Sequence, residues 1–120
     1  MAYKFAINNR TWTIEEVDKD WLLKEYKKEC ENATYCFGVT KYPIQTIYIN
    51  NELCDEVRKQ TLYHELMHCY LWNYVHNFNE IGEEAMCDIS ANSHDIIHLI
   101  VRNYFKYLEE CEMDKHFGEE

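Results

Sequence analysis

Hydrophobic and polar residues alternate in two short segments at the start of the chain, residues 3–7 and 11–14. Such alternation, combined with aromatic and β-branched side chains, is typical of strands with one buried face. Asn8-Asn9 lies between the two segments, so we predict a hairpin with a tight turn at these asparagines. Residues 36–41 and 46–50 are also rich in β-branched and aromatic side chains and predict two further strands.

Three longer segments have apolar residues at every third or fourth position, which predicts helices. The first begins after Asp18, a suitable N-cap residue, and extends to about Glu31. The other two cover about residues 55–74 and 83–110, and a polar break at 76–82 separates them. The order ββ-α-ββ-α-α predicts an α+β fold in which helices pack on a small, mostly antiparallel sheet.

The composition of the 120-residue chain is that of a globular protein, with 47% hydrophobic and 28% charged residues. A chain of this length forms one domain, residues 1–120, with a core that needs no disulfide bonds. It has neither an apolar run long enough to span a membrane nor the apolar region of a signal peptide, so we expect a cytoplasmic protein without membrane contact. The net charge of −10 and the absence of a Lys/Arg cluster argue against direct nucleic-acid binding. The acidic end, residues 109–120, is expected to fray in solvent.

Six cysteines are present, but their spacing does not indicate disulfide bonds. No Cys-x-x-Cys pair occurs, and no signal peptide directs the chain to an oxidising compartment. Cys69, Cys87 and Cys111 lie in apolar helical segments. We therefore expect reduced thiols, most of them buried.

The candidate chemistry lies in the second predicted helix, where residues 64–68 read His-Glu-Leu-Met-His. Residues four apart lie one turn apart on the same helix face, so His64 and His68 can both reach one metal ion. Glu65 follows the first ligand and can act as a general base beside the metal. Two incidental surface histidines are the alternative explanation.

A catalytic zinc ion usually has three protein ligands, so a third must come from elsewhere. Glu84 and Asp88, four residues apart in the next helix, can supply one ligand and one hydrogen-bond partner for a ligand histidine. This arrangement resembles the third-ligand helix of gluzincin peptidases and favours Glu84 as the ligand. His76 is a weaker candidate. Acidic residues also favour helix N-termini without any metal.

His94 and His98 form a second pair with four-residue spacing, but no glutamate lies between them in the pattern of the first motif. They lie too far along the helix from Glu84 to share its ion. We expect core or surface histidines there. Tyr63, Tyr70 and Tyr74 are expected to pack at the core or its boundary.

The strand at 46–50, the His-Glu-x-x-His motif at 64–68 and the run Glu84-x-x-Cys87-Asp88-x-x-Ala91-Asn92 together resemble the ImmA/IrrE family of metallo-endopeptidases, in particular its small phage and prophage members. The resemblance covers about residues 36–100. Cys87-Asp88 replaces the family's usual Ala-Asn, so the role of Asp88 is inferred from its position alone. We find no helix-turn-helix pattern in this sequence, so any regulatory effect is expected to act through a partner.

The resemblance implies a minimal zincin-like fold with Zn²⁺ held by His64, His68 and Glu84, and with Glu65 as general base. It implies an endopeptidase in the cytoplasm of a bacterial host, acting on a protein substrate such as a repressor of a phage or mobile element. An extended substrate would need a free strand edge, at 46–50 or at 36–41. The sequence does not indicate the oligomeric state.

A non-catalytic function is the main alternative. A small, acidic protein of this kind can use a zincin scaffold and its acidic surface to bind and inhibit a host protein, with zinc in a structural role. The intact Glu65 favours the enzyme, because a structural zinc site needs no general base.

Overall fold

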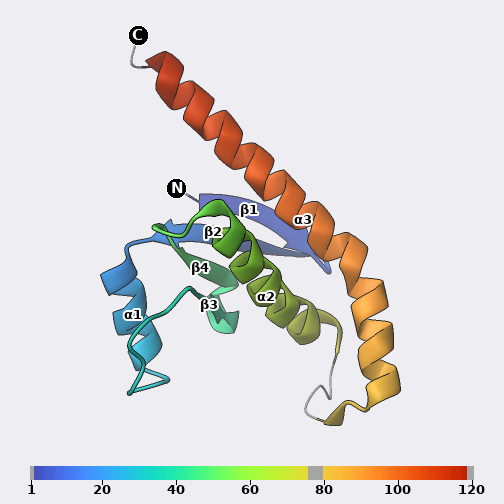
Figure 1. The fold of residues 1–120 in the computed structure, drawn as a ribbon. Helices are drawn as coiled ribbons and strands as arrows, with labels where there is room; N and C mark the ends of the chain where they lie inside the picture. The colour runs from blue at the N-terminus through green and yellow to red at the C-terminus, as the bar shows by residue number, and fades with distance from the viewer. Residues whose placement is uncertain (1, 76–79, 119–120) are drawn as a thin grey trace.

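The computed structural model describes residues 2–75 and 80–118, with side chains up to residue 113 (Figure 1). The elements are β1 (Ala2–Ile7), β2 (Arg10–Val17), α1 (Lys19–Lys27), β3 (Gly38–Lys41), the short 3₁₀ helix η1 (Tyr42–Ile44), β4 (Thr46–Asn50), α2 (Asp55–Tyr74) and α3 (Glu83–Gly118). The predicted α+β class and element order are confirmed. No helix in the described part of the chain is both long and apolar enough to cross a membrane.

The predicted hairpin of β1 and β2 is confirmed. Asn8 and Asn9 both have positive φ angles, 50° and 62°, as a two-residue turn of type I′ requires. Asparagine tolerates this left-handed backbone better than most residues. The turn therefore explains the Asn-Asn pair.

The sheet is mixed, with strand order β1-β2-β4-β3. β1 pairs with β2 and β3 pairs with β4 in antiparallel fashion, but β2 and β4 are parallel. The chain between β2 and β4 makes the crossover that a parallel pair needs, through α1 and β3. Because β4 has a neighbour on each side, the possibility that residues 46–50 offer a free edge is wrong. β3 lies at one edge of the sheet and β1 at the other.

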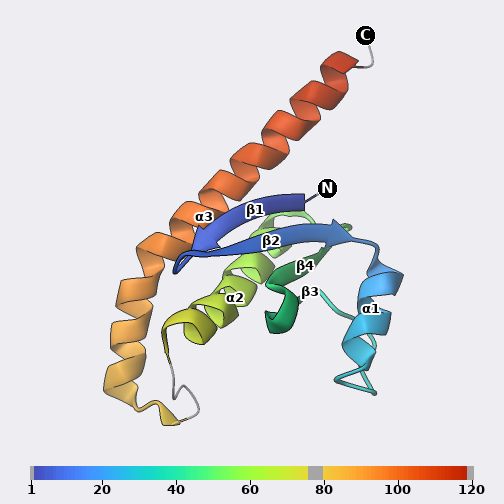
Figure 2. The ribbon, with the colours of Figure 1, turned by 180° about the vertical axis from the view of Figure 1, so that it is seen from behind.

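The helices cover both faces of the sheet (Figures 1 and 2). The core of α2, α3 and the sheet contains Ile47 and Ile49, whereas Tyr48 packs with the smaller cluster around Leu22 of α1. Alternate residues of β4 thus serve two cores, which explains why nearly the whole strand is buried.

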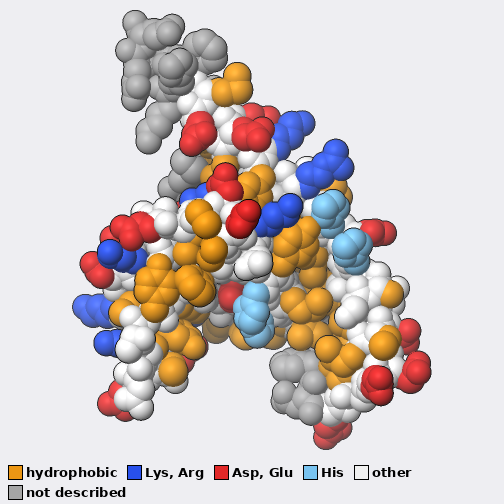
Figure 3. Space-filling model, viewed as in Figure 1, with side chains coloured by type: hydrophobic (Ala, Val, Ile, Leu, Met, Phe, Trp, Pro, Cys, Tyr) orange, Lys and Arg blue, Asp and Glu red, His pale blue; other side chains and the backbone are white. Residues whose placement is uncertain are grey.

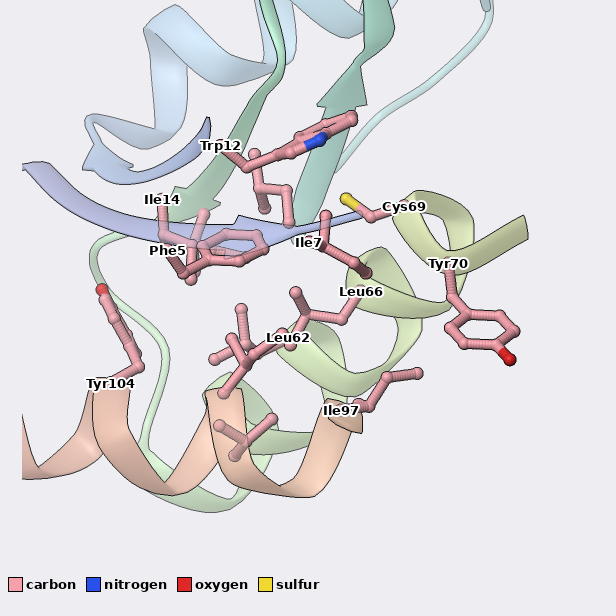
Figure 4. Close-up of a cluster of buried hydrophobic side chains, with 14 of the residues drawn as sticks. Phe5, Ile7, Trp12, Ile14, Leu62, Leu66, Cys69, Tyr70, Ile97 and Tyr104 are labelled. Atoms are coloured by element: carbon pink, nitrogen blue, oxygen red, sulfur yellow. The ribbon is translucent and has the colours of Figure 1, made fainter. Parts of the chain in front are cut away.

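The larger core joins the hairpin to α2 and α3 (Figure 4). Trp12, Ile14, Leu62 and Leu66 are completely buried in it, and Ile97 contributes from α3. Burial of such side chains typically stabilises a fold by about 1.5–3 kcal/mol each. This core therefore fixes the position of α2 on the sheet.

Two helix boundaries differ from the prediction. α1 ends at Lys27 rather than near Glu31, although the Asp18 side chain caps its start by accepting hydrogen bonds from the backbone N–H groups of Asp20 (3.0 Å) and Trp21 (3.2 Å). α3 continues to Gly118 instead of ending near residue 110, while fraying of this end in solution stays a prediction. The acidic end is rich in strong helix formers such as Glu, Lys and Met, which explains the continuation.

The prediction for the cysteines has two parts, that they are reduced and that most are buried, and only the first holds. All six are free thiols, but only Cys36 and Cys69 are buried. Cys30, Cys54 and Cys87 are exposed and Cys111 is intermediate, so the expectation of mostly buried thiols is wrong. For Cys87 the reason is that the first turns of α3 are almost wholly exposed.

Candidate metal centre

His64 and His68 lie one turn apart on α2, and both imidazoles are exposed. Their ring centroids are 5.0 Å apart and the ring planes are nearly perpendicular, at 76°. The opposite side of α2 carries the buried Leu62, Leu66 and Cys69. Packing of that apolar side against the sheet leaves both histidines facing outward, as the motif predicts.

Glu65 differs from its histidine neighbours because its side chain is buried, with 5% of the residue exposed. Its carboxylate oxygen Oε1 accepts a hydrogen bond of 2.9 Å from the Thr40 hydroxyl on β3. The other oxygen, Oε2, lies 3.9 Å from Nε2 of His64. One oxygen is thus held by Thr40, while the other lies near the His64 imidazole.

Gly38 lets β3 lie this close to α2. A Cβ atom at this position would be 2.8 Å from the Thr61 side chain and 3.2 Å from both the Glu65 and the Ile49 side chains. Any larger residue would therefore push the strand away from the helix. Gly38 and Thr40 share one face of β3 because side chains alternate along a strand.

A cleft of about 570 Å³ opens in front of these groups. His64, Glu65 and His68 line one wall, and the remaining lining is rich in aromatic side chains from Tyr26, Tyr35, Phe37 and Tyr42. Figure 3 shows histidine side chains at the centre of the face, between hydrophobic surfaces. The cleft therefore combines a polar wall with an apolar one.

The apolar wall is itself ordered by contacts. Tyr35 and Phe37, each 50% exposed, pack edge to face with ring centroids 5.0 Å apart. The Tyr35 hydroxyl accepts a hydrogen bond of 3.2 Å from the Asn50 side chain. Glu29, which also lines the cleft, is paired with Lys41 at 2.9 Å.

Burial controls the ionisation of two groups that line the cleft. Burial raises the pKa of the Cys36 thiol to about 11, and the Glu65 carboxylate adds to this effect. The pKa of Tyr42 is raised too, mainly by burial and further by the nearby Glu65 carboxylate. Cys36 therefore lines the cleft as a neutral thiol at neutral pH.

The structure does not bring Glu84 and Asp88 to the two histidines. Both acidic residues are exposed in the first turns of α3. Across residues 2–75 and 80–113, no three His, Cys, Asp or Glu side chains are close enough together to hold one metal ion. Glu84 as third ligand and Asp88 as hydrogen-bond partner stay predictions, and His76 lies outside the described residues.

His94 and His98 form a separate pair on the surface of α3. Of the two expected locations, core or surface, the surface is the observed one. Both are exposed, and their rings are stacked with centroids 5.8 Å apart. Nδ1 of His98 lies 2.8 Å from the Tyr63 hydroxyl of α2.

The three tyrosines of α2 differ in burial. Tyr63 is half-buried, Tyr70 is buried and Tyr74 is exposed, so the expected packing at the core or its boundary holds for the first two only.

Sequence reasoning missed the residues that surround the motif in space. Thr40, Gly38 and the aromatic pair Tyr35 and Phe37 all come from the segment before and within β3. The two-residue spacing of Gly38 and Thr40 was a usable signal, because it places both on the same face of the predicted strand. Which helix that face meets depends on the sheet order, which the sequence does not reveal.

Searches against protein-family models, curated proteins and solved structures find no match for this chain. The resemblance to the ImmA/IrrE family therefore rests on the motif residues alone. Any function must be argued from the cleft and its side chains.

Proposed function

We propose that this protein is a zinc-dependent endopeptidase. The observation that carries the proposal is the buried Glu65 carboxylate, which is held by Thr40 through one oxygen and has its other oxygen 3.9 Å from the exposed His64 imidazole. Burying a carboxylate costs stability, so its retention at this position calls for an explanation. A role as general base beside a metal ion is such an explanation.

His64 and His68 suit a zinc ion, because neutral imidazoles one helical turn apart are common zinc ligands. When bound, zinc supplies a Lewis acid that polarises a carbonyl group and lowers the pKa of a coordinated water molecule. Glu84 is the proposed third ligand. This part of the proposal requires the first turn of α3 to come within ligand distance of the two imidazoles.

Glu65 would move the proton in the reaction. In its ionised form, Oε2 accepts a proton from the attacking water molecule, while Oε1 keeps its hydrogen bond from Thr40. The protonated carboxyl group then donates this proton to the leaving amine of the cleaved peptide bond. Because the side chain is buried on its other sides, its carboxylate has little freedom to turn away from the substrate.

The substrate class follows from β3 and the cleft. No described strand pairs with the outer edge of β3, so an extended peptide can add to the sheet there. The aromatic wall with Tyr35 and Phe37 would accept a bulky apolar side chain next to the scissile bond. A repressor of a phage or mobile element is the substrate that the family resemblance suggests.

The deciding experiment replaces Glu65 with glutamine. Glu65→Gln keeps the shape and the bound zinc but removes the base, so cleavage of an unfolded protein or a peptide library should fall by about 100-fold or more. Glu56→Gln, the same change at an exposed position of the same helix, is the matched control. Equal cleavage by the wild type and Glu65→Gln would refute the peptidase.

A second candidate function is a non-catalytic module that binds and inhibits a host protein. The exposed position of Glu84 and the net charge of −10 favour it, because the described residues do not gather a complete ligand set. If this function is the real one, Glu65→Gln keeps full biological effect in cells. A peptidase would lose that effect.

A further inference from the structure

The outward face of α3 has no partner in the described chain. Figures 1 and 2 show the second half of α3 extending well beyond the sheet, past β1. Ile97, Val101 and Tyr104 point to the core. On the opposite side, five residues at helical spacing form a single stripe, and all are exposed: Leu99, Arg102, Lys106, Glu110 and Met113.

This outward stripe has a distinctive order of side chains. An apolar residue stands at each end, with Leu99 55% and Met113 58% exposed. Between them come the cations Arg102 and Lys106 and then the anion Glu110. None of these three charges forms a salt bridge within the described residues. Figure 3 shows basic and acidic side chains close together along this part of α3.

We propose that the outward stripe pairs with the same stripe of a second copy of this chain, with the two α3 helices antiparallel. Arg102 comes three residues after Leu99, and Glu110 comes three residues before Met113. A single antiparallel register therefore places Leu99 against the partner's Met113 and, at the same time, Arg102 against the partner's Glu110. Two-fold symmetry makes each of these contacts twice.

A groove borders the stripe on the side of α2. It measures about 720 Å³ and lies between α2 and α3. The stripe residues Leu99, Arg102 and Lys106 form part of its lining, and α2 contributes Lys59 and the acidic Asp55 and Glu56. Glu109 lies next to Glu110 and faces this groove on its own helix. In the proposed register the partner's Glu110 faces Arg102, which lines this groove, so this pair of charges is complementary.

The register also contains one unfavourable contact. Lys106 lies at the two-fold axis and faces Lys106 of the second copy. The paired segments are only about 21 Å long at 1.5 Å per residue. They therefore bury less surface area than a standard protein interface does. The dimer should therefore dissociate on dilution and weaken at high salt, and removal of the central like charges should tighten it.

The test is sedimentation equilibrium of the full chain at increasing concentration, at low and at high salt. Arg102→Glu and Glu110→Arg should each weaken dimerisation by about 10-fold or more, because each places like charges together twice. The double variant restores opposite charges and should dimerise like the wild type. Lys106→Leu should dimerise more tightly. Lys24→Glu, an exposed charge reversal on α1, is the control that changes the net charge by the same amount as Arg102→Glu.

Circular dichroism and melting curves confirm that each variant is folded. A wild type that is monomeric at every concentration overturns the proposal. A dimer that is unaffected by Arg102→Glu overturns it as well, because the contact would then lie elsewhere. Binding of a foreign acidic protein to the stripe, without self-association, would assign the surface to another partner. None of these readouts depends on peptidase activity.

Discussion

The Thr40 hydroxyl donates a hydrogen bond of 2.9 Å to Oε1 of Glu65, which joins the edge strand of the sheet to the helix that carries the His-Glu-x-x-His motif. The two residues are 25 positions apart in sequence. The bond occupies one oxygen of the proposed base and leaves the other facing His64. Thr40 is therefore a positioning residue in the proposed mechanism.

Removal of this hydroxyl should impair turnover more than substrate binding. Thr40→Val has the same shape but no donor, and a hydrogen bond to a charged group contributes about 1.5–3 kcal/mol. We expect kcat to fall about 10- to 100-fold with little change in KM or zinc content. Thr40→Ser keeps the hydroxyl and should recover most of the activity. Equal losses in both variants would show that the methyl group matters instead.

A methyl group at Gly38 should separate the strand from the helix. Gly38→Ala places Cβ 2.8 Å from Cγ2 of Thr61, and such overpacking typically costs about 1–3 kcal/mol of stability. Thr61→Ser removes that Cγ2 atom, so the double variant should recover part of the loss in urea unfolding. Gly82→Ala is the control, because nothing lies within 4 Å of its Cβ position. A Gly38→Ala variant as stable as Gly82→Ala would contradict the close approach.

The elements with a strong pattern were predictable from sequence. β4 and α2 have the predicted bounds, residues 46–50 and 55–74, because β-branched alternation and helical spacing are pronounced there. The local geometry of His64 and His68 follows from the helix alone. The same is not true of the groups that come from other elements.

The parallel pairing of β2 and β4 depends on the path of α1 and β3, which no local pattern encodes. Thr40 reaches Glu65 only because β3 is the edge strand next to α2. In the same way, the distance from Glu84 to the histidines depends on how α3 leaves the segment that follows α2. Sequence spacing alone cannot determine such a relationship between two helices.

The exposed and the buried cysteines should differ in the rate at which their thiols react. Cys30, Cys54 and Cys87 are exposed, whereas burial raises the pKa of Cys36 to about 11 and that of Cys69 as well. Because only the thiolate reacts, an aromatic disulfide reagent at pH 8 should label the three exposed thiols at least about 10-fold faster. Mass spectrometry of peptides identifies each site. Rapid labelling of Cys36 in the folded chain would contradict its burial.

Zinc content should distinguish the proposed ligand histidines from the other histidines of the chain. We expect about one zinc ion per chain, lost in His64→Ala and in His68→Ala, since each change removes one of the imidazoles on the exposed face of α2. His94→Ala is the matched control, because this exposed histidine lies on α3 in a separate pair. Loss of zinc in His94→Ala alone would move the site to α3.

Glu84 provides the sharpest form of this test, because the structure leaves its side chain exposed in α3 rather than beside the histidines. If it is the third ligand, Glu84→Gln replaces an anionic donor by a neutral one, and zinc affinity should fall markedly while Glu83→Gln leaves it unchanged. Asp88→Asn should lower the affinity about 10- to 100-fold, as loss of a ligand's hydrogen-bond partner does.

Zinc should also raise the melting temperature of the wild type, because a ligand set drawn from α2 and α3 exists only in the folded chain. This increase should disappear in Glu84→Gln. Calorimetric titration with zinc and melting curves with and without a chelator measure both effects. Unchanged affinity in Glu84→Gln would limit the protein ligands to α2 and leave the acidic start of α3 without a part in the metal site.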